Sequence, residues 1–155
     1  MKHLLVVLLC MVSLELTAQE KPLVWHTDLN KAVAEANQSN KPLLLFFTGS
    51  DWCGWCKRLQ GEVFAQAAFK NWAMKEVVLV EVDFPRRTPQ EPALRQQNMG
   101  LQQAFRPRGY PTIFFAKPVI GDNGQLANFT VLGQMGYQRG GANPWVAQAN
   151  TFIGG

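Results

Sequence analysis

The stretch Leu43-Leu44-Leu45-Phe46-Phe47, followed closely by Trp52-Cys53-Gly54-Trp55-Cys56-Lys57, decides how this chain folds. An unbroken apolar run of this length is typical of a strand that is buried on both faces. Cys53 and Cys56 are separated by about one helical turn. In a helix that begins at Cys53, unpaired backbone N–H groups and the positive end of the helix dipole would stabilise the Cys53 thiolate. The stretch therefore predicts a buried strand leading into a helix with a reactive dithiol pair.

A zinc site and a purely structural disulfide are the alternatives for this cysteine pair. Zinc in proteins is usually held by four ligands, and the remaining candidates are Cys10, His3 and His26, which lack zinc-site spacing. A structural Cys53–Cys56 disulfide would close a very short loop and would restrict the unfolded chain little. Both alternatives stay open, but the sequence favours dithiol redox chemistry and predicts no metal site.

A second motif, Tyr110-Pro111-Thr112, precedes the apolar strand Ile113-Phe114-Phe115-Ala116. A proline at the start of a strand is ordinary by itself. After a Cys-x-x-Cys motif, however, it resembles the thioredoxin superfamily, and more narrowly the exported bacterial thioredoxin-like proteins with Trp-Cys-x-x-Cys-Lys. The resemblance runs from about Lys41 to the C-terminus. It implies a cis peptide bond before Pro111 and a loop that faces the cysteines. We expect no cofactor.

The pattern along the chain alternates between helices and strands. The expected elements are a helix from Thr27 or Asp28, the strand ending at Phe47, the cysteine helix, a helical segment over 64–74, a strand over 77–83, a loop over 84–92, a helix over 91–105, strands over 112–117 and 125–132, and a terminal helix from Asn143-Pro144. With an N-terminal strand ahead of the first helix, this is the thioredoxin order. We therefore expect a thioredoxin-like α/β fold with a central mixed β-sheet flanked by helices.

The N-terminus has the pattern of a secretory signal peptide. Met1–His3 is basic, Leu4–Leu14 is apolar but too short to span a bilayer, and Ala18 is a small residue at the expected cleavage site. Glu15 is an unusual charge so close to the apolar run, and an uncleaved anchor or an internal helix remains the alternative. We expect secretion across the inner membrane, with the mature protein in the periplasm.

A signal peptide over residues 1–18 would leave residues 19–155 as one thioredoxin-like domain, long enough to bury a core. The formal net charge is +4. Basic residues gather in the middle of the chain, at Arg86, Arg87, Arg95, Arg106 and Arg108. They match no nucleic-acid-binding motif, so we expect no nucleic-acid partner. They fit a solvated basic face, or one that attracts an acidic partner or a membrane surface. The sequence carries no signal for the oligomeric state.

The predicted function is that of a thiol–disulfide oxidoreductase acting on protein disulfides in the cell envelope. Cys53, nearer the helix dipole, is the expected attacking thiolate, and Cys56 is the expected resolving thiol. Gly54-Trp55 replaces the Gly-Pro of ordinary thioredoxins, which leaves the redox potential open. We favour a reductase that receives its electrons from a membrane or envelope electron-transfer partner. A dithiol oxidase, or a chaperone-like peptide-binding module without redox turnover, are the alternatives.

Aromatic residues near the motif form the predicted substrate surface. The expected substrate-binding residues are Trp52, Gly54, Trp55, Tyr110 and Pro111, with Gly136-Tyr137 as a third wall by resemblance. Trp52 fits core packing equally well, because tryptophan is mostly buried wherever it occurs. Trp55 lies between the cysteines and must be near the surface if Cys53 is reactive.

One departure from the family pattern concerns proton transfer. Ordinary thioredoxins have a buried aspartate six residues before the first cysteine, where this chain has Phe47. Glu81 is a single charge among the apolar residues of the strand over 77–83. We predict that Glu81 replaces that aspartate and accepts the proton of Cys56, because burial would raise the pKa of its carboxyl group. The alternative is that Glu81 reaches solvent or pairs with a lysine or arginine.

Overall fold

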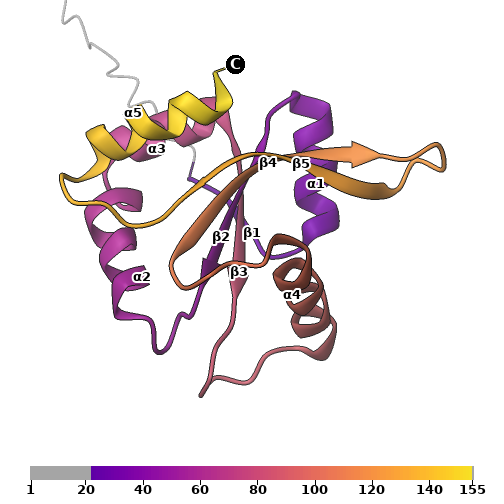
Figure 1. Ribbon diagram of the computed structural model, residues 1–155, viewed down its shortest axis with the longest axis horizontal. Coiled ribbons are helices and arrows are strands. Elements are labelled where there is room, and N and C mark those ends of the chain that lie inside the picture. The colour runs from indigo at the N-terminus through magenta and orange to yellow at the C-terminus, as the bar shows by residue number, and fades with distance from the viewer. Residues whose placement is uncertain (1–21, 155) are drawn as a thin grey trace, which may run out of the picture.

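A five-stranded mixed sheet forms the centre of the computed structural model, which describes residues 22–154 (Figure 1). The strands are β1 (Trp25–His26), β2 (Leu43–Thr48), β3 (Val78–Asp83), β4 (Thr112–Ile120) and β5 (Leu126–Met135), arranged in the order β1-β3-β2-β4-β5. The predicted signal peptide lies outside the described residues. The sequence of strands and helices expected for the rest of the chain is confirmed.

The apolar run identified in the sequence is the middle strand of this sheet. β2 pairs in parallel with β3 on one side and antiparallel with β4 on the other. All six of its residues are buried. Because successive side chains of a strand point to opposite faces, Leu43, Leu45 and Phe47 enter one core cluster, and Leu44 and Phe46 enter the other.

Helices cover both faces of the sheet (Figure 1). On one face lie α1 (Leu29–Ser39) and α4 (Pro92–Phe105); on the other lie α2 (Gly54–Leu59), the π-helical turn η1 (Gln60–Phe64), α3 (Ala67–Glu76) and α5 (Ala142–Ile153). The helical segment predicted over 64–74 begins later than expected, because Ala65 and Gln66 are not helical and separate η1 from α3. The cysteine helix therefore continues into η1, and α3 is a separate helix.

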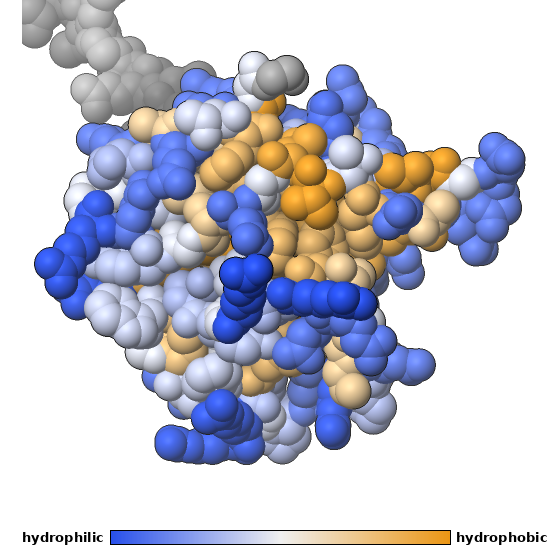
Figure 2. Space-filling view, viewed as in Figure 1, coloured by the Kyte–Doolittle hydropathy of each residue, from blue (hydrophilic) through white to orange (hydrophobic). Residues whose placement is uncertain are grey.

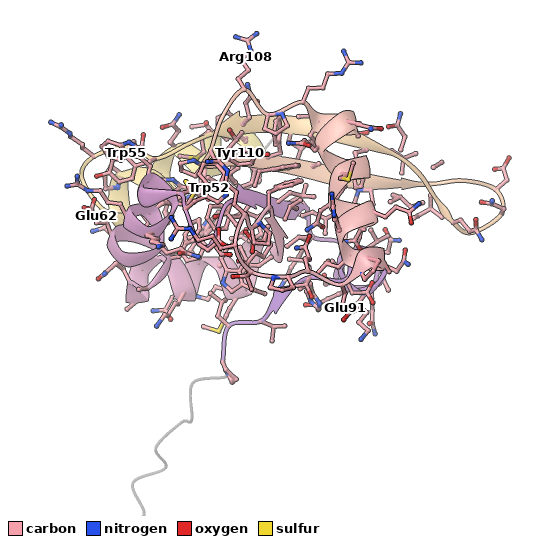
Figure 3. All side chains as sticks on the ribbon, turned by 90° about the horizontal axis from the view of Figure 1, so that it is seen from below. Trp52, Trp55, Glu62, Glu91, Arg108 and Tyr110 are labelled. Atoms are coloured by element: carbon pink, nitrogen blue, oxygen red, sulfur yellow. A yellow bond between two sulfur atoms is a disulfide. The ribbon has the colours of Figure 1, made fainter. Side chains whose placement is uncertain are left out.

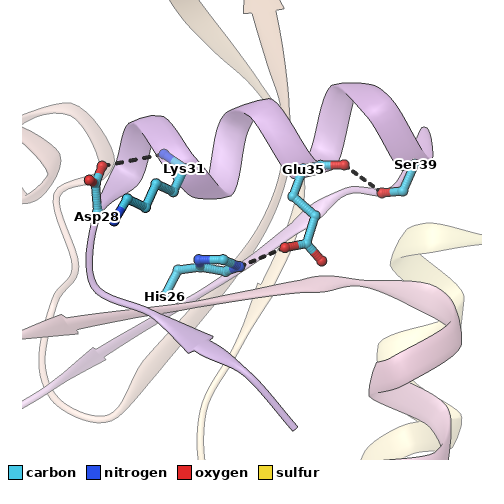
Figure 4. Close-up of polar contacts among 5 residues, drawn as sticks. All are labelled: His26, Asp28, Lys31, Glu35 and Ser39. Carbon is cyan, nitrogen blue, oxygen red and sulfur yellow. Dashed lines mark hydrogen bonds and ion pairs between the residues drawn. The ribbon is translucent and has the colours of Figure 1, made fainter. Parts of the chain in front are cut away.

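Polar side-chain contacts hold helix α1 in place (Figure 4). The Asp28 carboxylate caps its N-terminus by accepting the Lys31 backbone N–H. His26 Nε2 lies 2.8 Å from Glu35 Oε2, which joins β1 to the middle of the helix. Near its C-terminus the Ser39 hydroxyl donates to the Glu35 carbonyl. These contacts fix the helix that covers one face of β2 and β3.

The β4–β5 hairpin is longer than the sequence predicts. We expected β4 to end at Lys117, before Pro118, but pairing continues to Ile120 opposite Leu126. β2 stops pairing with β4 at Ala116, so within the described residues the far half of β4 has β5 alone as a neighbouring strand, and a proline is tolerated there. The result is an arm that projects from the sheet, with apolar side chains along it and a polar tip (Figure 2).

Candidate active site

The two cysteines of the motif form a disulfide across the first turn of α2. Cys53 is the N-cap residue of this helix, with extended backbone dihedrals, and is joined to Cys56 by a bond of 2.03 Å. Its sulfur also accepts the Cys56 backbone N–H at 3.2 Å. The Cys53 side keeps a trace of exposure, 5% against 1% for Cys56. The structure therefore places the two cysteines where the sequence predicts them, at the start of a helix that follows the buried strand.

A tight turn connects β2 to this helix and needs a glycine. The Trp52 and Cys53 N–H groups both donate to the Gly49 carbonyl, at 3.2 and 2.8 Å. A Cβ atom on Gly49 would lie 2.2 Å from the Trp52 ring, so the indole can rest on the backbone because no side chain is there. Just before the turn, Thr48 is completely buried and its hydroxyl has no hydrogen-bond partner among the described residues.

Trp52 is held on several sides. Its Nε1–H donates to the Phe84 carbonyl at 2.8 Å, and its ring meets Tyr110 edge to face with centroids 5.6 Å apart (Figure 3). The Arg86 guanidinium carbon lies 3.8 Å from the Trp52 ring centroid. Trp52 is therefore a partly buried connector between the motif and two other loops, which supports its packing interpretation and limits what it offers to a substrate.

Asp51 ties the loop after β3 to the motif. Its two carboxylate oxygens accept the backbone N–H groups of Arg86, Arg87 and Thr88, at 3.0, 2.7 and 2.9 Å. The hydrogen bond from Arg86, with those from the next two residues, holds the pKa of Asp51 well below its usual range, against a smaller opposing effect of burial. Sequence reasoning did not single out Asp51, because a carboxylate beside a motif is common and its partners lie on a distant loop.

Trp55 has different surroundings on the other side of the cysteines. It is 52% exposed, and its ring centroid lies 5.2 Å from that of Tyr137. The Arg58 guanidinium carbon is 5.5 Å from the Trp55 ring and 5.7 Å from the Tyr137 ring. Arg58 also pairs with Glu62, one turn along the helix, at 2.6 Å. Tyr137, the predicted third wall, thus lies against Trp55, and Trp55 presents an exposed aromatic ring two residues after Cys53.

Glu62 links the elements of this second side. It accepts hydrogen bonds from the Tyr137 hydroxyl and from Arg58, and these two contacts, in that order, lower the pKa of its carboxyl group. The hydrogen bond between Tyr137 and Glu62 also raises the pKa of Tyr137. Figure 3 shows Glu62 next to Trp55, at a distance from the Trp52–Tyr110 pair. Within this group the negative charge of Glu62 compensates the positive charge of Arg58.

The second motif reaches the first through Tyr110. The Tyr110–Pro111 peptide bond is cis, as the resemblance implied. The register of β2 and β4 places Thr112 opposite Phe47, so Pro111 lies at the end of β2 that leads into the motif. The Tyr110 hydroxyl accepts the Gln102 side-chain N–H at 2.7 Å, while burial raises the pKa of this phenol. The loop therefore stands beside Trp52, the residue that precedes Cys53.

Glu81 lies on the sheet face that carries the cysteine helix. It is opposite Phe46 in the parallel register and lines a cavity of about 290 Å³ together with Gln60 and Phe64 of η1. Burial, and secondly the charge of Asp83, raise the pKa of Glu81. β3 is an inner strand, and among the described residues no cation lies within ion-pair distance of Glu81. Gln60 follows Cys56 by one helical turn, and its backbone N–H donates to the Cys56 carbonyl.

Residues 22–154 contain no group of three or more potential metal ligands. In the same part of the chain, no helix is both long and apolar enough to cross a membrane.

Of the basic residues predicted to form a common face, Arg86 returns to the motif, whereas Arg108 points away from the body of the molecule (Figure 3). The site thus consists of the cysteine pair, two aromatic groups with one arginine each, and the nearby carboxylates.

Comparison with known proteins agrees with this geometry. Residues 24–118 match the family described as thioredoxin-like. The chain belongs to this thioredoxin-like family. It is 34% identical over 123 residues to the disulfide bond reductase DsbH of Chlamydia pneumoniae, covering 79% of this chain and 69% of DsbH. The thioredoxin-related protein DsbJ of the same organism is 36% identical over 84 residues, which are 54% of this chain and 24% of DsbJ.

Solved structures give the same relationship. A structure of a DsbH oxidoreductase superimposes with a TM-score of 0.73 at 32% identity, covering 86% of each chain. A thioredoxin from Thermus thermophilus superimposes with a TM-score of 0.57 at 17% identity, covering 81% of this chain and 83% of that one, and shares the fold. The predicted thioredoxin-like α/β fold is confirmed. The chain is a thiol–disulfide oxidoreductase homologue of DsbH, with Cys53 and Cys56 as its redox-active pair.

Proposed function

We propose that this thioredoxin-like protein reduces disulfides of other proteins in the cell envelope. The observation that carries the proposal is the Cys53–Cys56 pair at the start of α2, where Cys53 caps the helix beside the exposed Trp55. The relationship to DsbH, a disulfide bond reductase, supports the reducing direction. The predicted leader sequence supports an envelope location, with the mature protein beginning at Gln19.

Reduction would proceed through a mixed disulfide. The Cys53 thiolate attacks one sulfur of the substrate disulfide, that bond breaks, and the other substrate sulfur leaves as a thiolate that takes up a proton. Cys56 then loses its proton and attacks the Cys53 sulfur. The bond between Cys53 and the substrate breaks, the second substrate thiol leaves, and the Cys53–Cys56 disulfide remains. Two electrons have passed to the substrate, and a dithiol partner in the envelope must return them.

Helix position separates the roles of the two thiols. Cys53 stands at the N-cap, where its sulfur accepts the backbone N–H of Cys56 in the first turn, a position that favours a thiolate. Cys56 is buried more deeply in the core cluster that also contains Leu59 and Phe46. Burial disfavours a charged thiolate, so the resolving step requires a proton acceptor near Cys56. Glu81 is the candidate of this proposal, since it lines a cavity together with Gln60, the residue one helical turn after Cys56.

We assign Glu81 as this acceptor, acting through the cavity that it shares with Gln60. Its raised pKa allows it to take a proton closer to neutral pH than an exposed glutamate does. Glu81→Gln should slow the resolving step and alter its pH profile, with alkylation of Cys53 nearly unchanged. Glu76→Gln, which removes an exposed charge at the end of α3, is the matched control. An unchanged pH profile in Glu81→Gln would remove Glu81 from the mechanism.

The direction of the reaction is tested by equilibrating the purified protein with glutathione buffers. We expect a reduction potential below about −220 mV, within the range of thioredoxins and glutaredoxins that act as reductants. The reduced protein should also reduce insulin, and Cys53→Ser should not. A potential near that of strong dithiol oxidants, about −120 mV, would contradict the reductase proposal.

A further inference from the structure

Arg86 lies in a distant loop, but its side chain rests on the residue that precedes Cys53. Its guanidinium carbon is 3.8 Å from the ring centroid of Trp52, the residue immediately before Cys53. Stacking of this kind combines cation–π attraction with contact between two flat groups. The position of the Arg86 charge relative to Cys53 is therefore set by Trp52.

The backbone of this loop is held as well. The Asp51 carboxylate accepts the Arg86 backbone N–H at 3.0 Å and those of the next two residues. The Trp52 indole N–H donates to the Phe84 carbonyl, two residues before Arg86. Because both the backbone and the side chain of Arg86 are anchored to residues flanking Cys53, little conformational entropy would be lost when its guanidinium binds a ligand.

Within the described residues, the charge of Arg86 has no counter-charge at ion-pair distance. Over residues 22–154 the ion pairs within 4.0 Å join His26 to Glu35 and Arg58 to Glu62. Asp51, the carboxylate nearest in sequence to Trp52, directs its oxygens to backbone N–H groups of the loop. The guanidinium N–H groups of Arg86 make no hydrogen bond within the described protein, and the residue is exposed. Arg58 on the opposite side is compensated, and Arg86 is not.

We propose that Arg86 determines substrate specificity by binding an aspartate or glutamate side chain next to the reactive cysteine of the substrate. A guanidinium held over an aromatic ring can donate two parallel N–H groups to a carboxylate, which makes the contact directional. The substrates so favoured are protein disulfides flanked by acidic residues. The inference rests on the proposed function for the identity of the substrate as a disulfide, and it adds the chemistry by which that substrate is selected.

The test compares two disulfide-bonded peptides that differ at one position next to a cysteine, where one has glutamate and the other glutamine. Stopped-flow tryptophan fluorescence gives the second-order rate constant of thiol–disulfide exchange between reduced protein and each peptide. We expect the glutamate peptide to react about three- to tenfold faster, as for a charge-assisted contact at a partly exposed site. The ratio should fall as salt is added, because exposed charges are screened.

Variants then assign the preference to Arg86. Arg86→Gln should bring the ratio of the two rate constants close to one, and Arg86→Lys should keep part of it, since the charge remains without the planar stack. Arg87→Gln is the matched control: it removes the same charge from the next residue, whose backbone N–H meets Asp51 in the same way. The wild-type ratio should persist in this control.

The outcomes separate this inference from the proposed function. Oxidised protein is also mixed with the two dithiol peptides, because the same mixed disulfide forms in both directions. A preference for the glutamate peptide with faster exchange in the oxidising direction would support the role of Arg86 and contradict the reductase proposal. Equal rates for both peptides in both directions would overturn the role of Arg86, as would a preference that survives Arg86→Gln or is lost equally in Arg87→Gln.

Discussion

The two tryptophans of the motif flank the same cysteine but belong to different kinds of structure. Trp52 rests on Gly49, donates to the Phe84 carbonyl and meets Tyr110 and Arg86. Trp55 is 52% exposed and meets the side chains of Tyr137 and Arg58. The first side is therefore built into the framework, while the second presents an aromatic surface whose charges are already paired. The same Trp-Cys pair thus occurs twice in the motif, but its two tryptophans have different surroundings.

Alanine substitutions at the two tryptophans provide the largest expected contrast. Trp52→Ala should lower the free energy of unfolding by about 3 kcal/mol, because it removes a large packed ring and leaves the Phe84 carbonyl without its donor. Trp55→Ala should change it by less than about 1 kcal/mol, as for other exposed positions. Trp55→Ala should instead slow exchange with protein substrates more than with a small disulfide. Urea unfolding and the two exchange assays measure these effects. Equal losses of stability would contradict the assignment of the two roles.

Glycine substitutions test the same contrast at the backbone. A Cβ atom on Gly49 would meet the Trp52 ring at 2.2 Å, so Gly49→Ala should cost about 1–3 kcal/mol through displacement of the indole. A Cβ atom on Gly54, in the first turn of α2, would meet no side chain of the described residues within 4 Å. Gly54→Ala should therefore be neutral or slightly stabilising. If both variants unfold at the same urea concentration, the close contact between Gly49 and Trp52 does not hold in solution.

The Asp51 clamp, meaning the hydrogen bonds that the Asp51 carboxylate accepts from the backbone of residues 86–88, should make the stability of the protein sensitive to acid. The pKa of Asp51 is depressed in the folded protein, so its contribution to stability is present above the unfolded value of about 3.9 and is lost as pH falls from there towards the folded value. Below about pH 4 the wild type should lose more stability than Asp51→Asn does, because asparagine does not titrate. Unfolding by urea between about pH 7 and pH 2 measures the difference. Parallel pH profiles for the two proteins would argue against the clamp.

Local pattern was sufficient to predict the framework of the molecule. The run Leu43–Phe47 is the buried central strand because it is apolar on both faces, and Asp28 caps α1 because its carboxylate can reach the first-turn N–H groups. The cysteine pair was identified from residue type and spacing, whereas the role of Glu81 stays a prediction. The extension of β4 past Pro118 was missed, since a proline usually ends a strand and the number of neighbouring strands is a property of the sheet.

The rest of the site depends on contacts between distant segments. Asp51 and Arg86 are 35 residues apart, and their meeting is determined by where the loop after β3 returns to the motif. Glu62 and Tyr137 are 75 residues apart, and the sequence carries no sign that their side chains share a hydrogen bond. Arg86 was predicted to be one residue of a broad basic face, because charge clustering in a sequence says nothing about which guanidinium lies against which ring.

The central claim, that Cys53 attacks and Cys56 resolves, is tested most directly by trapping the mixed disulfide. Cys56→Ser and Cys53→Ser are each incubated with a disulfide-bonded substrate protein, and covalent complexes are quantified by non-reducing electrophoresis and mass spectrometry. Cys56→Ser should accumulate the complex, because the attacking thiol remains and nothing releases the substrate. Cys53→Ser should form little, because its remaining thiol, Cys56, lies inside the helix and is less exposed than Cys53, at 1% against 5%. Equal trapping by the two variants, or stronger trapping by Cys53→Ser, would contradict this division of roles.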